Sequence, residues 1–170
     1  MKLEKATNVA MIITCATIVA RLIPGVYQTI VPPAAVRPYK PGERLTSTKA
    51  LTFTTASQTL ILITASNCHF CTESMPFYRT LVDQAHAVGA RLVAATAEPL
   101  DMNRQYLRSN GVNVDDVISS IENGLRFRGT PTLVLVSSNG EVVNAWDGKL
   151  PEDKEREVFA TLARAPKRNS

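Results

Sequence analysis

The sequence predicts an α/β domain with a mixed central β-sheet flanked by helices. Three observations lead to this fold class. Residues 60–64 form a short apolar run typical of a buried strand, residues 72–88 repeat apolar side chains at three- and four-residue steps, and residues 91–96 form a second buried run. Strand, helix and strand in this order predict a parallel βαβ unit. A hairpin and a final helix later in the chain add antiparallel strands to it.

The second half of the chain completes this sheet. Residues 132–136 read Thr-Leu-Val-Leu-Val, which is a strand pattern. Asn139-Gly140 then predicts a tight turn into residues 141–146, the strongest hairpin signal in the chain. A final helix is expected over residues 152–163.

Three details of the central region follow from single residues. Pro76 lies inside the helical pattern of residues 72–88 and predicts a kink early in that helix, which Gly89 ends. A short helix is expected over residues 101–109. Residues 112–125 show no pattern that assigns them to a helix or a strand.

The first 31 residues differ from the rest of the chain. Lys2 and Lys5 precede an apolar or small run from Val9 to Ala20, and no clear small-x-small cleavage site follows it. This pattern predicts a retained transmembrane signal anchor at residues 1–31, with the N-terminus inside and the domain on the periplasmic or extracytoplasmic side of a bacterial cytoplasmic membrane. A cleaved signal peptide and a buried core helix are the alternatives.

The remaining organisation follows from composition. Prolines and a glycine predict a partly extended spacer at residues 32–49, followed by the domain at residues 50–165 and a basic tail at residues 166–170. The formal net charge is +4, and the basic residues are scattered rather than interleaved with aromatic ones. We therefore expect no nucleic-acid binding.

The segment Cys68-His69-Phe70-Cys71 carries the clearest chemical signal. It lies between a predicted strand and a predicted helix, so the helix N-terminus can stabilise a thiolate at Cys68, the nucleophile of disulfide exchange. A static disulfide or half of a metal site are the alternatives. A zinc site needs about four ligands, and His69 and His86 are the only histidines beside this cysteine pair. The segment therefore favours redox chemistry on thiols.

A second motif, Gly129-Thr130-Pro131-Thr132, enters a predicted strand about sixty residues after Cys68. With the Cys-x-x-Cys pair at the start of a kinked helix, the hairpin and the last helix, the chain resembles the thioredoxin superfamily over about residues 40–163. The predicted anchor, the spacer and Tyr39-Lys40-Pro41-Gly42-Glu43 make it most similar to membrane-anchored TlpA-like or redoxin thiol–disulfide oxidoreductases.

The resemblance implies roles for single residues. Cys68 is expected to be the attacking thiol and Cys71 the resolving thiol of a redox-active disulfide. Pro131 is expected to be a cis-proline beside the dithiol, with Thr130 contacting the substrate backbone. Substrates are expected to dock against Phe70 as well.

The chain departs from the family pattern at three positions. Asn67 stands where many thioredoxins have a tryptophan, and Leu62 stands where they have a buried acid on the strand. Many TlpA-like reductases have a glutamate at the position of Ser74, whereas this chain has Glu73 one residue earlier. Glu73 is therefore a candidate for handling the proton of Cys71, and a plain surface residue is the alternative.

His69 has two interpretations. As a hydrogen-bond donor beside Cys68 it would stabilise the thiolate and make the protein more oxidising. As an exposed residue it would only shape the docking surface, together with Phe70.

The sequence thus predicts an extracytoplasmic thiol–disulfide oxidoreductase without organic cofactor or metal, acting on protein disulfides and recycled by a membrane or extracytoplasmic redox partner. Reduction is the favoured direction. A net oxidase or isomerase is one alternative, and a redox-inactive, copper-binding thioredoxin-like module is another, because soft thiolates suit Cu(I).

Overall fold

The computed structural model describes residues 36–164, so the predicted anchor at residues 1–31 and the tail at residues 166–170 lie outside the described residues. Within the described part, no helix is long and apolar enough to span a bilayer. The elements in chain order are β1 (Gln58–Ile63), α2 (His69–Glu73), α3 (Met75–Ala87), β2 (Arg91–Thr96), α4 (Leu100–Ser109), β3 (Asp116–Ser119), β4 (Thr132–Ser137), β5 (Val142–Asp147) and α5 (Glu152–Ala163).

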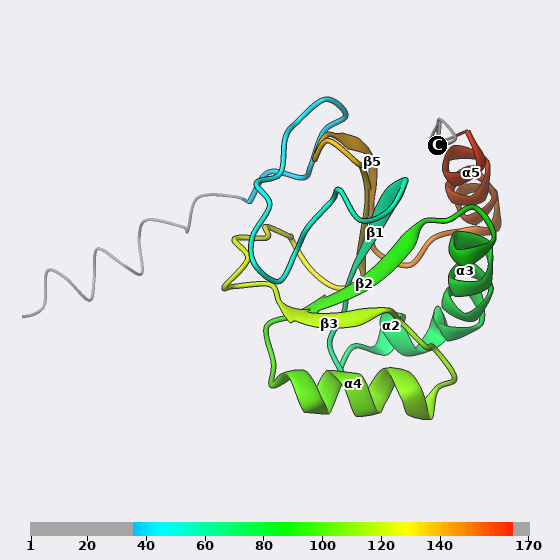
Figure 1. The fold of residues 1–170 in the computed structure, drawn as a ribbon. Coiled ribbons are helices and arrows are strands. Elements are labelled where there is room, and N and C mark those ends of the chain that lie inside the picture. The colour runs from blue at the N-terminus through cyan, green and yellow to red at the C-terminus, as the bar shows by residue number, and fades with distance from the viewer. Residues whose placement is uncertain (1–35, 165–170) are drawn as a thin grey trace, which may run out of the picture. The chain divides into compact units, whose positions relative to one another are not determined.

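The strands form one mixed sheet in the order β3-β2-β1-β4-β5 (Figure 1). β1 pairs in parallel with β2, and β2 with β3, whereas β4 is antiparallel to both β1 and β5. The predicted mixed sheet with a parallel βαβ unit and a hairpin is therefore confirmed. β1 is central and buried along its whole length, which explains the run of four apolar residues at 60–63.

Strand β3 is an element that the sequence did not reveal. It lies in the patternless stretch 112–125 and pairs with β2 from Val93↔Asp116 to Thr96↔Ser119. Its four residues contain only Val117 and Ile118 as apolar side chains. Two residues are too few to establish a strand alternation, so pairing with β2 decides the conformation.

The predicted helix over residues 72–88 is two helices, and it begins earlier than expected. α2 starts at His69, and the break falls at Ser74, whose amide donates to the carbonyl oxygens of Phe70 and Cys71 at 3.2 Å each. Pro76 lies in the first turn of α3, where a missing N–H breaks no helical hydrogen bond. The kink that was predicted from Pro76 is therefore a break between two helices, and it lies two residues before the proline.

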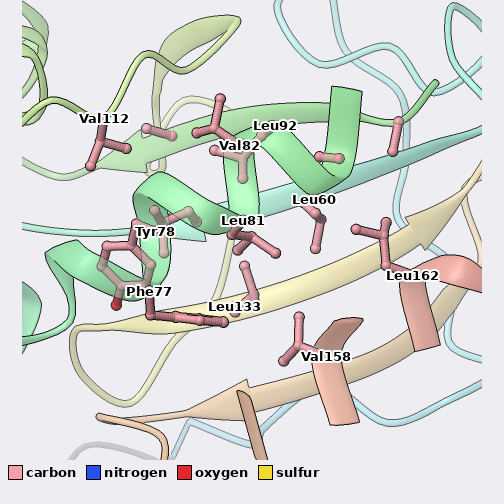
Figure 2. Packing of buried hydrophobic residues seen from close by; sticks show 14 of the residues in the cluster. Leu60, Phe77, Tyr78, Leu81, Val82, Leu92, Val112, Leu133, Val158 and Leu162 are labelled. Atoms are coloured by element: carbon pink, nitrogen blue, oxygen red, sulfur yellow. The ribbon is translucent and has the colours of Figure 1, made fainter. Parts of the chain in front are cut away.

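Alternate side chains of β1 enter two separate apolar clusters. Leu60 and Leu62 contribute to the cluster on one face of the sheet, which α3 and α5 cover (Figure 2). Leu81 of α3 and Leu162 of α5 fill this cluster, and both are essentially inaccessible to solvent. Figure 1 shows α3 and α5 side by side over this face. This packing holds the start of α3, and with it α2, against the end of β1.

Within residues 36–164, no helix contributes to the opposite cluster. Ile61 and Ile63 of β1 pack there against Tyr39, Phe53 and Leu125, which come from irregular segments before β1 and after β3. Part of the predicted spacer at residues 32–49 thus packs against the domain.

Backbone hydrogen bonds fix this N-terminal segment to the β4–β5 hairpin. Gly42 donates to the carbonyl oxygen of Val142 at 2.9 Å, and Leu45 donates to that of Gly140 at 2.8 Å. Gly140 has a φ of +83°, and a Cβ there would lie 2.8 Å from the carbonyl oxygen of Leu45. The glycine of the predicted turn therefore also allows the close approach of the segment, and the domain begins before residue 50.

Candidate active site

Cys68 lies at the N-terminus of α2, five residues after the end of β1. It has extended backbone angles, and its Sγ accepts a hydrogen bond from the amide of Cys71 at 3.0 Å, which caps the helix. Cys68 and Cys71 are joined in a disulfide with their Cα atoms 5.2 Å apart. One turn of helix brings residues three apart onto the same side, so this spacing suits a disulfide within the first turn.

The two sulfur-bearing residues differ in their exposure. Cys68 is half-buried, whereas Cys71 is 0% exposed and belongs to the hydrophobic interior. A reacting thiol or disulfide from another molecule can therefore approach Cys68 more easily than Cys71. The amide of Cys71 is also placed to stabilise negative charge on the Sγ of Cys68.

The second predicted motif lies directly against this disulfide. The Thr130–Pro131 peptide bond is cis, as the resemblance implied, and Pro131 is buried. The carbonyl oxygen of Thr130 lies 3.3 Å from the Sγ of Cys68. The sheet explains this meeting, because Thr132 at the start of β4 pairs with Ile63 at the end of β1.

The loop around Pro131 has hydrogen bonds on both of its sides. The hydroxyl of Thr132 donates to the carbonyl oxygen of Gly129 at 2.9 Å, and the amide of Gly148 donates to that of Pro131 at 2.7 Å. Hairpin β4–β5 thus holds the loop in place. Phe70 lies between the two cysteines on α2, and its side chain is 54% exposed.

His69 contacts an acid rather than the sulfur of Cys68. Its side chain is 78% exposed, and its Nε2 lies 3.2 Å from Oε1 of Glu73, one helical turn further on. Its ring is 5.7 Å from that of Phe70. Among the contacts of the described residues, none joins the His69 ring to Cys68. The geometry therefore favours the docking-surface interpretation of His69.

Glu73 makes ion pairs at the surface. Lys149 donates to its Oε2 at 2.8 Å, and this hydrogen bond, with the smaller effect of nearby His69, lowers the pKa of the Glu73 carboxyl below its ordinary value. A group that carries a proton between thiols near neutral pH needs a raised carboxyl pKa. Leu62, at the position of the family's buried acid, is fully buried opposite Leu133 and Ala94.

A polar network supports the loop before Cys68, and no motif in the sequence marks its members. The carboxylate of Glu98 accepts hydrogen bonds from the amide of Ser66 at 2.8 Å, from its hydroxyl at 2.9 Å, and from Nδ2 of Asn103 at 3.0 Å. Asn103 is buried and also accepts from the hydroxyl of Thr64 at 3.2 Å. The carboxyl ends of neighbouring parallel strands lie at the same edge of a sheet. Because β1 and β2 are parallel, the residues that follow β2 are expected to lie near Cys68, which follows β1.

The site also lies close to α4, beyond the end of the sheet. The hydroxyls of Thr72 on α2 and Tyr106 on α4 are 2.9 Å apart, and Figure 1 shows the two helices near each other. Within residues 36–164, no group of three or more histidine, cysteine, aspartate or glutamate side chains is arranged to hold a metal ion.

The fold and the disulfide-bonded Cys-x-x-Cys pair beside a cis-proline define a thiol–disulfide oxidoreductase. Residues 49–163 match the family model of the thioredoxin-like domain, so the chain belongs to the thioredoxin-like family. No curated protein sequence matched the chain significantly.

Solved structures with the same fold include a protein of Chlorobium tepidum assigned as the thiol:disulfide interchange protein DsbE. It has a TM-score of 0.57 and 21% identity, and the match covers 72% of this chain and 98% of that one. A thiol:disulfide interchange protein from Bacteroides sp. has a TM-score of 0.56 and 12% identity over 79% and 96% of the two chains. Peroxidoxin BcpB from Mycobacterium tuberculosis has a TM-score of 0.56 and 13% identity over 73% and 96%. At these identities the likeness is one of fold.

Proposed function

We propose that this protein is a membrane-tethered, extracytoplasmic reductase of protein disulfides. The unequal exposure of the two cysteines carries the proposal. Cys68 is half-buried at a helix N-terminus with an amide donor 3.0 Å from its Sγ, and Cys71 is fully buried behind it. This arrangement suits an attacking thiolate at Cys68 and a resolving thiol at Cys71.

The reaction is an exchange of two electrons. In the reduced protein, the Cys68 thiolate attacks one sulfur of a substrate disulfide, that S–S bond breaks, and the first substrate thiolate leaves and takes a proton from water. The thiolate of Cys71, whose proton goes to water, then attacks the Sγ of Cys68 and releases the second substrate thiolate. The substrate becomes a dithiol and Cys68–Cys71 a disulfide. A dithiol partner returns the pair to the reduced state by the same steps.

Two features beside Cys68 support reduction as the direction of the reaction. Oxidants stabilise their reduced form by stabilising the attacking thiolate. The ring of His69 contacts Glu73 rather than Cys68, and the Sγ of Cys68 faces the carbonyl oxygen of Thr130 at 3.3 Å. A carbonyl oxygen carries partial negative charge and disfavours a thiolate. Both features support reduction over net oxidation.

The backbone around Pro131 supports polypeptide substrates. The loop holds Thr130 against Cys68, so an extended chain with a cysteine can lie beside the loop while its sulfur reaches the Sγ of Cys68. The exposed ring of Phe70 adds an apolar contact on α2.

The membrane tether rests on the sequence alone. The positive start and the apolar run from Val9 to Ala20 support an anchor with the domain outside. A reporter fused to the C-terminus, combined with fractionation, tests this. A reporter active only in the cytoplasm would contradict the tether and the compartment together.

Mixed-disulfide trapping tests the exchange mechanism. Cys71→Ser should accumulate disulfide-linked substrates through Cys68, whereas Cys68→Ser should accumulate none. Equal trapping by the two variants would contradict the assigned roles. A reduction potential measured in glutathione buffers then decides between reductase and oxidase, and metal analysis of the same reduced protein tests the copper-binding alternative.

A further inference from the structure

An open groove lies beside the Cys68–Cys71 disulfide. It has a volume of about 380 Å³, and its lining comes from the loops after β1 and β2 and from the loop before Pro131. The lining includes Asn67, Glu98, Phe127 and Thr130. Because Asn67 precedes Cys68 and the carbonyl of Thr130 lies 3.3 Å from its Sγ, the groove adjoins the reacting sulfur.

Glu98 is the only ionisable residue in this lining. Its carboxylate accepts three hydrogen bonds, from the amide and hydroxyl of Ser66 and from Asn103. All three donors are neutral, and Oε2 receives only one of the bonds. Among the described residues, no lysine, arginine or histidine forms an ion pair with Glu98. The groove therefore presents a half-buried negative charge that its own hydrogen bonds hold in a fixed position.

The nearby arginines are directed elsewhere. Arg126 forms an ion pair with Glu43 and stacks over the ring of Tyr39 at 4.7 Å, and Nε of Arg128 donates to the carbonyl oxygen of Val36 at 3.0 Å. The negative charge of Glu98 is thus unmatched in a chain whose formal net charge is +4.

Phe127 supplies the apolar part of the lining. It is half-buried and packs against the second core cluster, so its ring is held in place. A lysine or arginine side chain has an apolar stem and a cationic end. Such a side chain can lay its stem along Phe127 and place its charge at Glu98.

We propose that the groove selects cysteine-containing polypeptide segments that carry lysine or arginine next to the reacting cysteine. Glu98 sets this specificity, and Phe127 supports the stem of the basic side chain. This inference rests on the proposed exchange at Cys68, and it adds the class of substrate that the site prefers.

Activated peptides test the preference. Three peptides differ only in the residue beside their single cysteine, which is Lys, Gln or Glu, and each cysteine is linked to thionitrobenzoate. The Cys68 thiolate of the reduced full-length protein attacks the peptide sulfur, the peptide–thionitrobenzoate bond breaks, and the released thionitrobenzoate is followed by absorbance. We expect kcat/KM for the Lys peptide to exceed that for the Gln peptide by about fivefold, the size of a partly exposed ion pair.

Glu98→Gln is the matched variant, because a glutamine keeps the shape and can still accept from the amide of Ser66. Its Lys/Gln ratio should fall to about one. The ratio compares two peptides on the same variant, so a general change in the rate of exchange does not affect it. Glu122→Gln removes the same charge from an exposed turn outside the groove, and it should keep the wild-type ratio. Raising the ionic strength should reduce the Lys/Gln ratio of the wild type, because salt screens the attraction to Glu98. This test needs no variant.

The outcomes separate the two proposals. An unchanged Lys/Gln ratio in Glu98→Gln, or equal rates for all three peptides with the wild type, overturns the specificity while leaving exchange at Cys68 intact. A release rate that is the same in wild type and Cys68→Ser overturns the exchange function, and the specificity with it.

Discussion

Nζ of Lys149 lies 2.8 Å from Oε2 of Glu73, so the loop before α5 is linked to the helix that carries the disulfide. The same carboxylate lies 3.2 Å from Nε2 of His69 through its other oxygen. Glu73 is therefore part of a surface ion-pair group, although its sequence position suggested a proton carrier for Cys71. The hydrogen bond from Lys149 lowers the pKa of the Glu73 carboxyl below its ordinary value.

Glu73→Gln should leave the pH profile of disulfide exchange unchanged between neutral and alkaline pH, because a carboxyl of lowered pKa is already ionised there. Stability should respond at acidic pH instead. A lowered pKa in the folded state contributes stability above the unfolded pKa, and this contribution is lost as the pH falls through the folded value. Unfolding at several pH values checks this. A shifted rate profile would restore Glu73 as a proton carrier.

His69→Ala should change the reduction potential little. Its ring is 78% exposed and directed at Glu73, and for a two-electron couple a surface interaction of ~0.4 kcal/mol corresponds to about 10 mV. His86→Ala is the matched control, because His86 also pairs with an acid, Asp115, at 3.2 Å. Equilibration with glutathione buffers measures both variants. A potential more negative by tens of millivolts for His69→Ala alone would show that His69 stabilises the Cys68 thiolate.

Leu81→Ala should destabilise the domain by about 2–5 kcal/mol, because it leaves a cavity between α3, α5 and the sheet. Met102→Ala is the control, since Met102 is 51% exposed on α4 and its loss should cost no more than about 0.5 kcal/mol. Denaturant unfolding followed by circular dichroism measures both. Equal effects would mean that the core packing in Figure 2 is not the main source of stability.

Tyr39→Phe should destabilise the domain by about 1 kcal/mol, because the hydroxyl of Tyr39 accepts a hydrogen bond from the amide of Arg126 at 3.0 Å. Tyr39→Ala should cost about 3 kcal/mol or more, since it also removes a buried ring. Lys40→Ala, at an exposed neighbour, serves as the control. If none of the three changes the free energy of unfolding, the segment before residue 50 is a free spacer after all.

The buried strands show why much of the fold could be predicted. β1 and β2 are buried on both faces, so each contains four consecutive apolar residues, 60–63 and 92–95, and these runs mark them as strands. The β4–β5 turn could also be predicted, because Asn-Gly favours the backbone angles of a tight hairpin turn. In contrast, β3 and the packing of Tyr39 depend on neighbours far away in the sequence, and no local pattern encodes them.

The sequence by itself determined the reactive pair and its location. Cys68 and Cys71 lie one turn apart after a buried strand, and local helix geometry is enough to bring their sulfur atoms together. Only the tertiary structure decided what surrounds the pair. Antiparallel pairing of β4 with β1 brings Thr130 to Cys68, and parallel pairing of β2 with β1 brings Glu98 to the loop before it. Ser66 and Glu98 are separated by 32 positions in the sequence, and Cys68 and Thr130 by 62 positions. Such contacts arise from strand register, which a single sequence does not specify.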